Sequence, residues 1–207
     1  MDWMEIEMLF LNSANEIRTE DTLDKNKAKL ILEQLKIDPY SVLGQILVHY
    51  AGIIINGYLR FLGGEEKGEH SGILSFNKKV KECYDGKKLI VAHDIWGGLF
   101  AISNGDFEGD IRNIWYFAPD SLDWENLNIY YSQFVVWACD EKVKKFYQNF
   151  LWNQNERLIE KIEANQAVLM YPFLWASECE IEKANKKIVP IAELISLNAN
   201  LQKAFNN

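Results

Sequence analysis

A block of short apolar runs separated by turn residues, between residues 53 and 118, constrains the fold most strongly. The first two runs, Ile53–Ile55 and Tyr58–Leu62, flank Asn56-Gly57. This dipeptide favours the positive φ angles of a type I′ turn, so the pattern predicts a β-hairpin with Gly57 in its turn. Three further strands are predicted, at Leu89–His93, Leu99–Ile102 and Ile114–Phe117. The first of these three is almost continuously apolar, which favours a central strand covered on both faces.

Helical patterns precede this block, in residues 1–50. They predict three helices, indicated in turn by the spacing of Met4, Met8 and Leu11, by an apolar stripe from Ala28 to Leu35, and by the capping residue Ser41. Gly52 is the predicted stop of the third helix, because glycine readily ends helices.

Residues 130–205 return to a mainly helical pattern. Asp140 can cap a helix whose apolar stripe runs from Val143 to Leu151, and Pro190 suits the first turn of a last helix. Helices, then strands, then helices again predict one α+β domain over residues 1–207, with a mixed or antiparallel sheet over about 53–118.

Size and charge narrow the classes of function. The 207 residues, 48% apolar and 25% charged, suit one globular domain. Thirty acidic residues against 22 basic ones give a net charge of −8. This balance argues against binding to nucleic acid or to an anionic membrane, because phosphate contact needs a basic face. The longest apolar run, Ala167–Ala176, contains Pro172 and is shorter than the roughly 20 residues of a membrane span.

Cysteine usage indicates a reducing compartment. Cys83, Cys139 and Cys179 are widely separated and odd in number, whereas a disulfide framework uses an even, denser set. The acidic N-terminus lacks the positive region of a signal peptide. We therefore expect a soluble, cytoplasmic protein with free thiols.

No motif in the sequence indicates an enzyme. The three histidines and three cysteines show no pair at metal-ligand spacing. Gly97-Gly98 lacks both the third glycine and the lysine of phosphate-binding loops. The expectation is a protein with no metal, no cofactor and no catalytic residue.

The most suggestive segment is acidic and aromatic. Between residues 106 and 125, six carboxylates stand against Arg112 alone, and Asp120, Asp123 and Glu125 lie among aromatic residues that include Trp124. Three interpretations stay open. The segment is a solvated loop with core tryptophans, or a surface for a basic protein partner. In the third interpretation, the segment binds a small molecule or a carbohydrate, or hydrolyses it, with paired carboxylates beside an aromatic platform.

The end of the predicted central strand carries a second candidate. A pair such as His93 and Asp94 can do acid–base chemistry, but neighbouring residues on a strand point to opposite faces, so the two cannot line one pocket. Gly97 and Gly98 predict a tight turn between two strands. Asp94 and Trp96 remain candidate binding residues.

Five runs, in one order along nearly the whole chain, resemble an uncharacterised bacterial family of unknown function. They are Tyr40–Gly44, Gly57–Gly63, Gly97–Ile102, Trp115–Trp124 and Tyr171–Trp175. The most specific part reads Tyr-Phe-Ala-Pro-Asp, at residues 116–120. Ser121 and Asp123 stand where that family usually has threonine and glutamate, and the stretch containing His93 and Trp96 also departs from it.

More remotely, helices leading into a sheet with a glycine-rich strand turn and a following aromatic strand are similar to the SUKH superfamily. That resemblance implies an α+β scaffold acting as a binding module. Many bacterial members of the superfamily are immunity proteins that bind toxins. Toxin-targeting members are typically acidic, and their partners are often basic nucleases. The resemblance supplies no catalytic residue, and a fold does not fix a function.

The sequence thus predicts a SUKH-like, non-enzymatic binding module. Its docking surface for a basic, toxin-like protein is expected to include Asp120, Asp123, Trp124 and Glu125. A homodimer through the apolar patch Tyr171–Trp175 is the alternative mode of protein contact.

Overall fold

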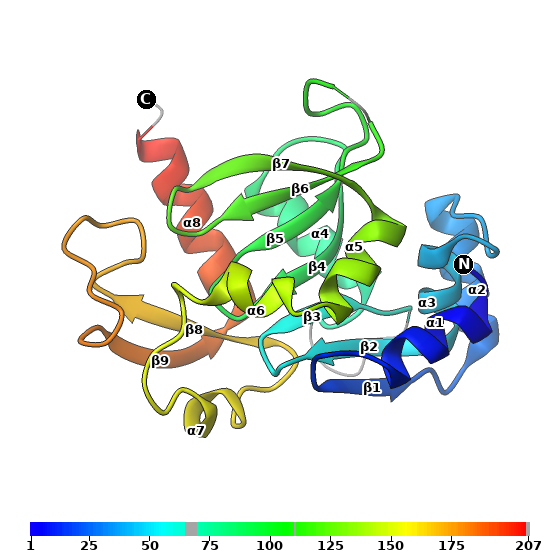
Figure 1. Cartoon of the computed structure of the whole chain (residues 1–207). Helices are drawn as coiled ribbons and strands as arrows, with labels where there is room; N and C mark the ends of the chain where they lie inside the picture. Colours follow the sequence, from blue (N-terminus) through cyan, green and yellow to red (C-terminus); the bar gives the residue numbers. More distant parts are fainter. Residues whose placement is uncertain (65–69, 110, 206–207) are drawn as a thin grey trace.

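The computed structural model describes residues 1–64, 70–109 and 111–205 and shows an α+β architecture (Figure 1). Within these residues, the main sheet has seven antiparallel strands, each paired with its neighbour in sequence. The strands are β1 (Ile17–Asp21), β2 (Tyr50–Ile55), β3 (Leu59–Leu62), β4 (Leu89–Asp94), β5 (Leu99–Ile102), β6 (Asn113–Ala118) and β7 (Asp123–Tyr130). A second sheet is the hairpin of β8 (Gln166–Tyr171) and β9 (Asn185–Pro190).

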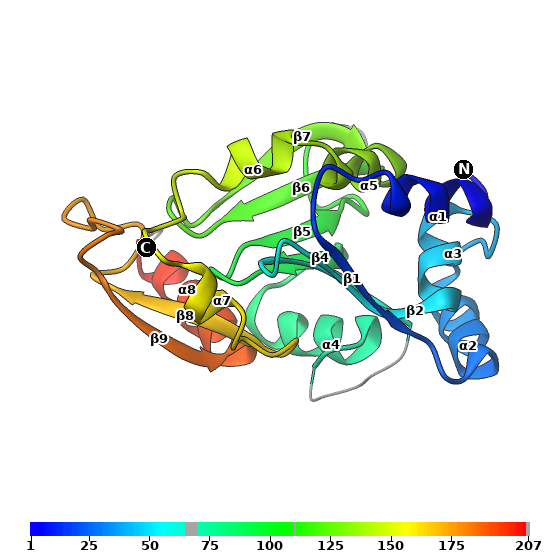
Figure 2. The ribbon, with the colours of Figure 1, turned by 60° about the horizontal axis from the view of Figure 1, so that its bottom comes forward.

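Helices cover both faces of the main sheet (Figures 1 and 2). On one face lie α5 (Tyr131–Cys139) and α6 (Lys142–Tyr147), and Phe100 of β5 packs on Phe134 with ring centroids 4.7 Å apart. On the other face lies α4 (Ile73–Cys83), with α8 (Ile191–Phe205) beside it. The other helices are α1 (Trp3–Leu11), α2 (Lys25–Leu35), α3 (Val42–His49) and α7 (Glu156–Ile159). The predicted α+β class is therefore confirmed.

The predicted hairpin and central strand are also confirmed. Asn56 and Gly57 connect β2 to β3 with φ angles of 50° and 76°, the positive values that the Asn-Gly turn requires. β4 is the fourth of the seven strands, and its residues from Ile90 to Asp94 are buried. An apolar strand with helices on both faces occupies this position because every side chain it carries leaves water.

The third helix starts as predicted but ends early. The Ser41 hydroxyl accepts a hydrogen bond from the Gly44 amide at 3.0 Å and caps α3. The predicted stop at Gly52 is wrong, because α3 ends at His49 and Gly52 lies within β2. The three isoleucines that follow Gly52 favour strand over helix through their branched Cβ atoms.

Several elements escape the sequence pattern. β1 and β7 are edge strands in which no residue is fully buried, so they lack a clear apolar alternation. Within the predicted block of strands, α4 has only Gly72 at its N-cap, which supplies no capping side chain. The β8–β9 hairpin interrupts the C-terminal region that we predicted to be mainly helical.

The C-terminal helices differ from prediction in length. Asp140 accepts a hydrogen bond from the Lys142 amide at 2.9 Å, but α6 ends at Tyr147 and does not continue to Leu151. The last helix begins at Ile191, directly after Pro190, which closes β9.

Two buried polar side chains fasten distant segments of the chain to each other. The side-chain amide of Asn15, before β1, donates to the carbonyls of Ala138 and Asp140 at 3.0 and 2.9 Å, which ties this segment to the end of α5. Arg60 of β3 is 3% exposed and donates to the carbonyls of Ile162, Glu163 and Gln166. Burial lowers the pKa of Arg60 to about 10, so the guanidinium stays charged and these carbonyls compensate it.

Among the helices in the described part of the chain, none has the length and apolar character needed to cross a membrane.

Candidate functional site

The turn between β4 and β5 is organised around a buried carboxylate. Asp94 is 0% exposed, and its Oδ1 accepts hydrogen bonds from the amides of Trp96 and Gly98, each at 2.9 Å. Its Oδ2 accepts from the hydroxyls of Tyr116 at 2.9 Å and Tyr147 at 3.3 Å. Four donors thus surround one carboxylate inside the core. A buried charge is tolerated only with such a set of partners.

Gly97 and Gly98 are turn residues, and their surroundings explain why. Gly97 has φ of 91°, a conformation that L side chains rarely adopt. A Cβ on Gly98 would overlap the Asp94 carboxylate and approach the Tyr116 ring to 2.6 Å. The turn can therefore close over Asp94 only with a glycine at position 98.

His93 and Asp94 lie on opposite faces of β4. Burial raises the pKa of Asp94 to about 6, although its four hydrogen bonds act in the opposite direction. The His93 ring stacks on Phe76 of α4 at 4.9 Å, and burial, assisted by the charge of Arg60, lowers the pKa of His93 to about 3. The neutral imidazole and the carboxylate face different helices, so they do not form an acid–base pair.

Trp96 is a core residue as well. It is 1% exposed, and its ring stacks on Tyr147 at 5.2 Å. The sequence suggested Asp94 and Trp96 as binding residues, and their burial corrects this interpretation, because neither side chain can reach a docking partner. Because aspartate is rarely buried, the sequence around Asp94 does not indicate that this side chain lies in the core.

The turn between β6 and β7 is the opposite case. Asp120 lies in the turn, Asp123 begins β7, and Glu125 follows two residues later; all three are exposed. The Oδ1 of Asp123 accepts a hydrogen bond from the Trp124 amide at 2.7 Å. Within the described residues, no lysine or arginine pairs with any of the three carboxylates. We call these three residues the acidic turn.

Trp124 does not share a face with its acidic neighbours. In the ladder between β6 and β7, Trp124 is opposite Phe117, whereas Glu125 is opposite Tyr116. The Trp124 ring packs edge-on against Phe117 at 5.4 Å and lies 5.6 Å from the Lys88 ammonium. Because neighbouring residues of a strand face opposite sides, Trp124 cannot serve as a stacking platform beside Asp123 and Glu125. The carbohydrate interpretation required that platform.

The start of the acidic segment has a structural role. Asp106 forms an ion pair with Lys88 at 3.2 Å and accepts hydrogen bonds from the amides of Lys87 and Lys88. Burial alone would raise the pKa of Asp106, but these hydrogen bonds outweigh it, so the pKa is lowered. Asp106 thus holds two loops together, and Asp110 lies outside the described residues.

The predicted dimer patch at Tyr171–Trp175 is partly covered. Tyr171 is exposed, but Phe173 and Trp175 stack on each other at 5.4 Å, and Phe205 of α8 packs edge-on against Trp175 at 4.9 Å. The homodimer stays a prediction.

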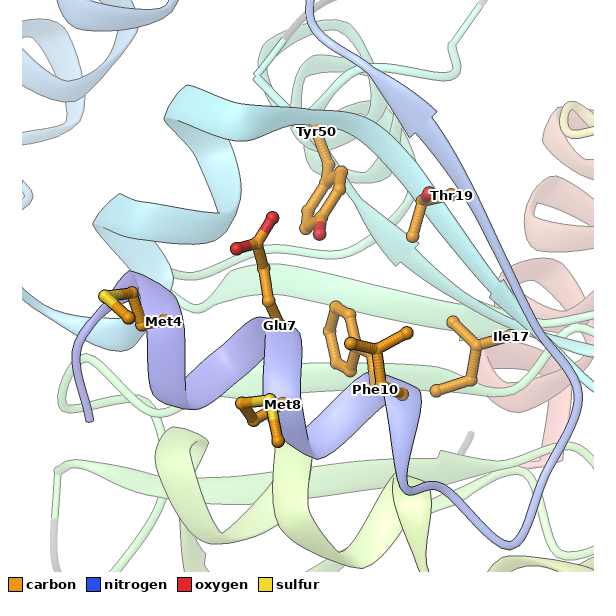
Figure 3. A pocket seen from close by; sticks show the side chains of 8 residues that line it. Met4, Glu7, Met8, Phe10, Ile17, Thr19 and Tyr50 are labelled. Atoms are coloured by element: carbon orange, nitrogen blue, oxygen red, sulfur yellow. The ribbon is translucent and has the colours of Figure 1, made fainter.

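A groove between α1 and β1 was not singled out by the sequence. It has a volume of about 410 Å³ and is lined by Met4, Glu7, Met8, Phe10, Leu11, Ile17, Thr19 and Tyr50 (Figure 3). The sequence pattern indicates only that Met4, Met8 and Leu11 form an apolar stripe on a helix, yet all three are exposed. The signal that could have revealed the groove is a second stripe on the same helix, Trp3, Ile6 and Phe10, which packs inward and leaves the first without a role in the core.

Among the described residues, no group of three or more histidine, cysteine, aspartate or glutamate side chains is arranged so that it could hold a metal ion. Cys83, Cys139 and Cys179 are free thiols, and burial raises the pKa of Cys139 to about 11.

Comparisons with known proteins place this chain among uncharacterised relatives. The family described as Protein of unknown function DUF2625 matches residues 2–194. The uncharacterized protein YbfG of Escherichia coli (strain K12) is 31% identical over 184 residues, which cover 88% of this chain and 84% of YbfG. An uncharacterized protein of Haemophilus influenzae (strain ATCC 51907 / DSM 11121 / KW20 / Rd) is 30% identical over 155 residues, or 73% of this chain and 68% of that protein.

The family match covers nearly the whole chain, including the five runs up to Trp175 that suggested a family of unknown function. The remoter similarity to the SUKH superfamily stays a prediction. This protein therefore belongs to the DUF2625 family of proteins of unknown function.

Proposed function

We propose that this protein is a non-enzymatic binding module that docks a basic protein partner on the acidic turn. The observation that carries the proposal is the state of Asp120, Asp123 and Glu125: they are exposed and, within the described residues, have no cationic partner. Asp106, by contrast, is neutralised by Lys88. Carboxylates that balance no charge within the protein can balance charge on a partner.

Physical chemistry favours recognition by such a surface. Clustered charges of one sign steer an oppositely charged protein and raise the rate of encounter at low salt. The site lies at the end of an edge strand, so nothing in the sheet lies beyond it (Figure 1). The proposed docking surface does not include Trp124. Its ring lies on the other face of β7, where it packs against Phe117.

An immunity-type role, with a basic toxin as the partner, is the specific form of this proposal. It rests on the resemblance to the SUKH superfamily. The proposal also locates the protein in the cytoplasm, where a reducing environment suits its three free thiols.

The test is an affinity pull-down from native cells at low salt, with bound proteins identified by mass spectrometry. We compare the wild type with Asp120→Lys/Asp123→Lys. The matched control is Glu156→Lys/Glu160→Lys, which reverses two exposed charges at α7 and alters the net charge equally.

We expect a stoichiometric basic protein that elutes as salt rises, that binds the α7 control, and that the acidic-turn variant loses. Retention of the same protein by the acidic-turn variant would place the docking surface elsewhere. Loss from both double variants would show an effect of net charge without a specific surface.

A further inference from the structure

The groove between α1 and β1 forms a second candidate docking surface, far from the acidic turn. Both overall views place α1 at one end of the molecule and the turn from β6 to β7 well away from it, on the side of the β8–β9 hairpin (Figures 1 and 2). Side chains of α1 form one wall, and Ile17 and Thr19 of β1 form the other, with Tyr50 at one end (Figure 3).

We propose that this groove docks a basic amphipathic segment of a protein partner. Apolar side chains of the segment contact Met4, Met8 and Leu11, and its lysine or arginine side chains reach Glu7 and Asp21. The proposal is independent of the acidic turn.

The outer apolar side chains of α1 are exposed to solvent. Met4, Met8 and Leu11 are 72%, 56% and 80% exposed, and they follow one another at spacings of four and three along α1. Residues with these spacings form a single stripe on a helix. Contiguous exposed apolar side chains mark contact surfaces more often than isolated ones do. Methionine suits this role because its flexible thioether adapts to different partners.

Anchoring of α1 does not require that stripe. The opposite side of the helix holds it in place: Ile6 is fully buried, and Trp3 stacks on His49 of α3 at 3.6 Å. Phe10 packs near Tyr50 with ring centroids 5.9 Å apart. The outer stripe can therefore change without loss of the helix.

The negative charge of the N-terminal segment favours a basic partner. Residues 1–24 contain seven acidic residues and one arginine, a net charge of −6 out of −8 for the whole chain. The arginine, Arg18, pairs with Glu16 at 3.5 Å. Glu7 and Tyr50 both line the groove, and Asp21 is the partner of Tyr50 in the ladder between β1 and β2, so both carboxylates lie close to the end of the groove. Burial raises the pKa of Tyr50 to about 12, and these carboxylates act in the same direction. A partner must bring positive charge to this end.

The same charge argues against the other occupants of such a groove. A second copy of the chain would bring another N-terminal segment with net charge −6, and the like charges would repel. An anionic lipid surface is disfavoured for the same reason. A basic amphipathic segment has both complementary properties.

A defined peptide tests the proposal. The probe is a fluorescein-labelled synthetic peptide about 15 residues long, with leucines at helical spacing and lysines between them. Fluorescence anisotropy measures its affinity for the full chain. The groove variant is Met8→Ser/Leu11→Ser, and the control is Leu30→Ser on α2, which changes an apolar residue that is 64% exposed. Thermal melts confirm that each variant is folded.

We expect the groove variant to bind at least about tenfold more weakly, equivalent to about 1.4 kcal/mol. Glu7→Gln should weaken binding and reduce its salt dependence, whereas Leu30→Ser and Asp120→Lys/Asp123→Lys should bind as the wild type does. The last comparison separates this surface from the acidic turn.

Three results would overturn the proposal. The groove variant could bind the peptide as tightly as the wild type. Binding could be lost in the acidic-turn variant and kept in the groove variant, which would place the peptide on the other surface. Sedimentation could show a wild-type dimer that the groove variant converts to a monomer, which would make a second copy the occupant.

Discussion

The turns after β4 and β6 each carry an aspartate close to aromatic residues, but the surroundings of the two carboxylates are opposite. Asp94 ends β4 two residues before Trp96, and Asp120 follows β6 three residues after Phe117. Tyr116 donates a hydrogen bond to Asp94, and the charge of Asp120 helps to raise the pKa of Tyr116. Asp94 is enclosed by four hydrogen-bond donors, whereas Asp120 faces solvent. The difference arises from position in the sheet: the first turn lies at its centre under α6, and the second leads to its edge. Position relative to the core decides whether such a carboxylate stabilises the fold or is free for a partner.

The largest expected effect comes from closing the space at the central turn. Gly98→Ala places a methyl group against the Asp94 carboxylate and the Tyr116 ring, and we expect it to lower the free energy of unfolding by more than about 3 kcal/mol. Gly52→Ala is the control, because its Cβ meets nothing nearer than 3.8 Å. Urea unfolding measures both. Equal stability of the two variants would contradict the tight closure described for Gly98.

The second prediction concerns pH. Burial raises the pKa of Asp94 to about 6, above its value in the unfolded chain, so the folded state takes up the proton first on acidification. The contribution of Asp94 to stability is therefore complete below about pH 4 and is lost as pH rises through 6. We expect the unfolding free energy of the wild type, minus that of Asp94→Asn, to fall by about 2 kcal/mol between pH 4 and 7.

His93→Gln supplies a control of opposite sign. The folded pKa of His93, lowered to about 3, lies below that of an unfolded histidine, so its contribution is present at neutral pH and is lost on acidification. The corresponding difference should rise between pH 4 and 7. Parallel urea titrations at several pH values measure both differences, and a flat profile for Asp94→Asn would refute the assignment.

Substitutions on the two faces of β7 should have different effects, and their effect on stability should be smaller than those above. Trp124→Ala removes a half-buried ring that packs on Phe117, and we expect a loss of about 2 kcal/mol in unfolding free energy. Its affinity for a basic partner should not change. Glu125→Gln should show the reverse, with weaker binding and unchanged stability. Weaker binding by both variants would mean that Trp124 contributes to the docking surface after all.

The smallest effect is expected at the outer turn itself. Asp120→Asn/Asp123→Asn should change the unfolding free energy by less than about 0.5 kcal/mol, because no cation in the described residues pairs with either side chain. A larger loss, measured by urea unfolding, would give these carboxylates a structural role and weaken the proposal that they serve a partner.

The sequence predicts what depends on local pattern. The Asn56-Gly57 hairpin and the buried strand Leu89–Asp94 follow from turn chemistry and from a continuous apolar run. The edge strands could not be predicted in this way, because none of their side chains is fully buried and their sequences carry no continuous apolar run. Without β7 as a predicted strand, the sequence groups Trp124 with Glu125 in one surface. Only the alternation of side chains along β7 shows that the two residues face opposite sides.

Among the candidate site residues, the sequence predicts the exposure of those carboxylates that follow the usual rule that charged side chains lie in solvent. Asp120, Asp123 and Glu125 are exposed, as carboxylates usually are. Asp94 departs from that rule because of Tyr116 and Tyr147, which lie 22 and 53 residues further along the chain. A single sequence does not show such distant partners.

The order of the strands has a consequence for synthesis on the ribosome. Because each strand pairs with its predecessor, every strand from β2 to β7 finds its partner already translated, and the sheet can grow in the direction of translation. Tyr147, however, leaves the ribosome well after Asp94. Until α6 forms, the Asp94 carboxylate lacks one of its four donors and its cover from water, so the burial of this charge is a late event in the folding of the nascent chain.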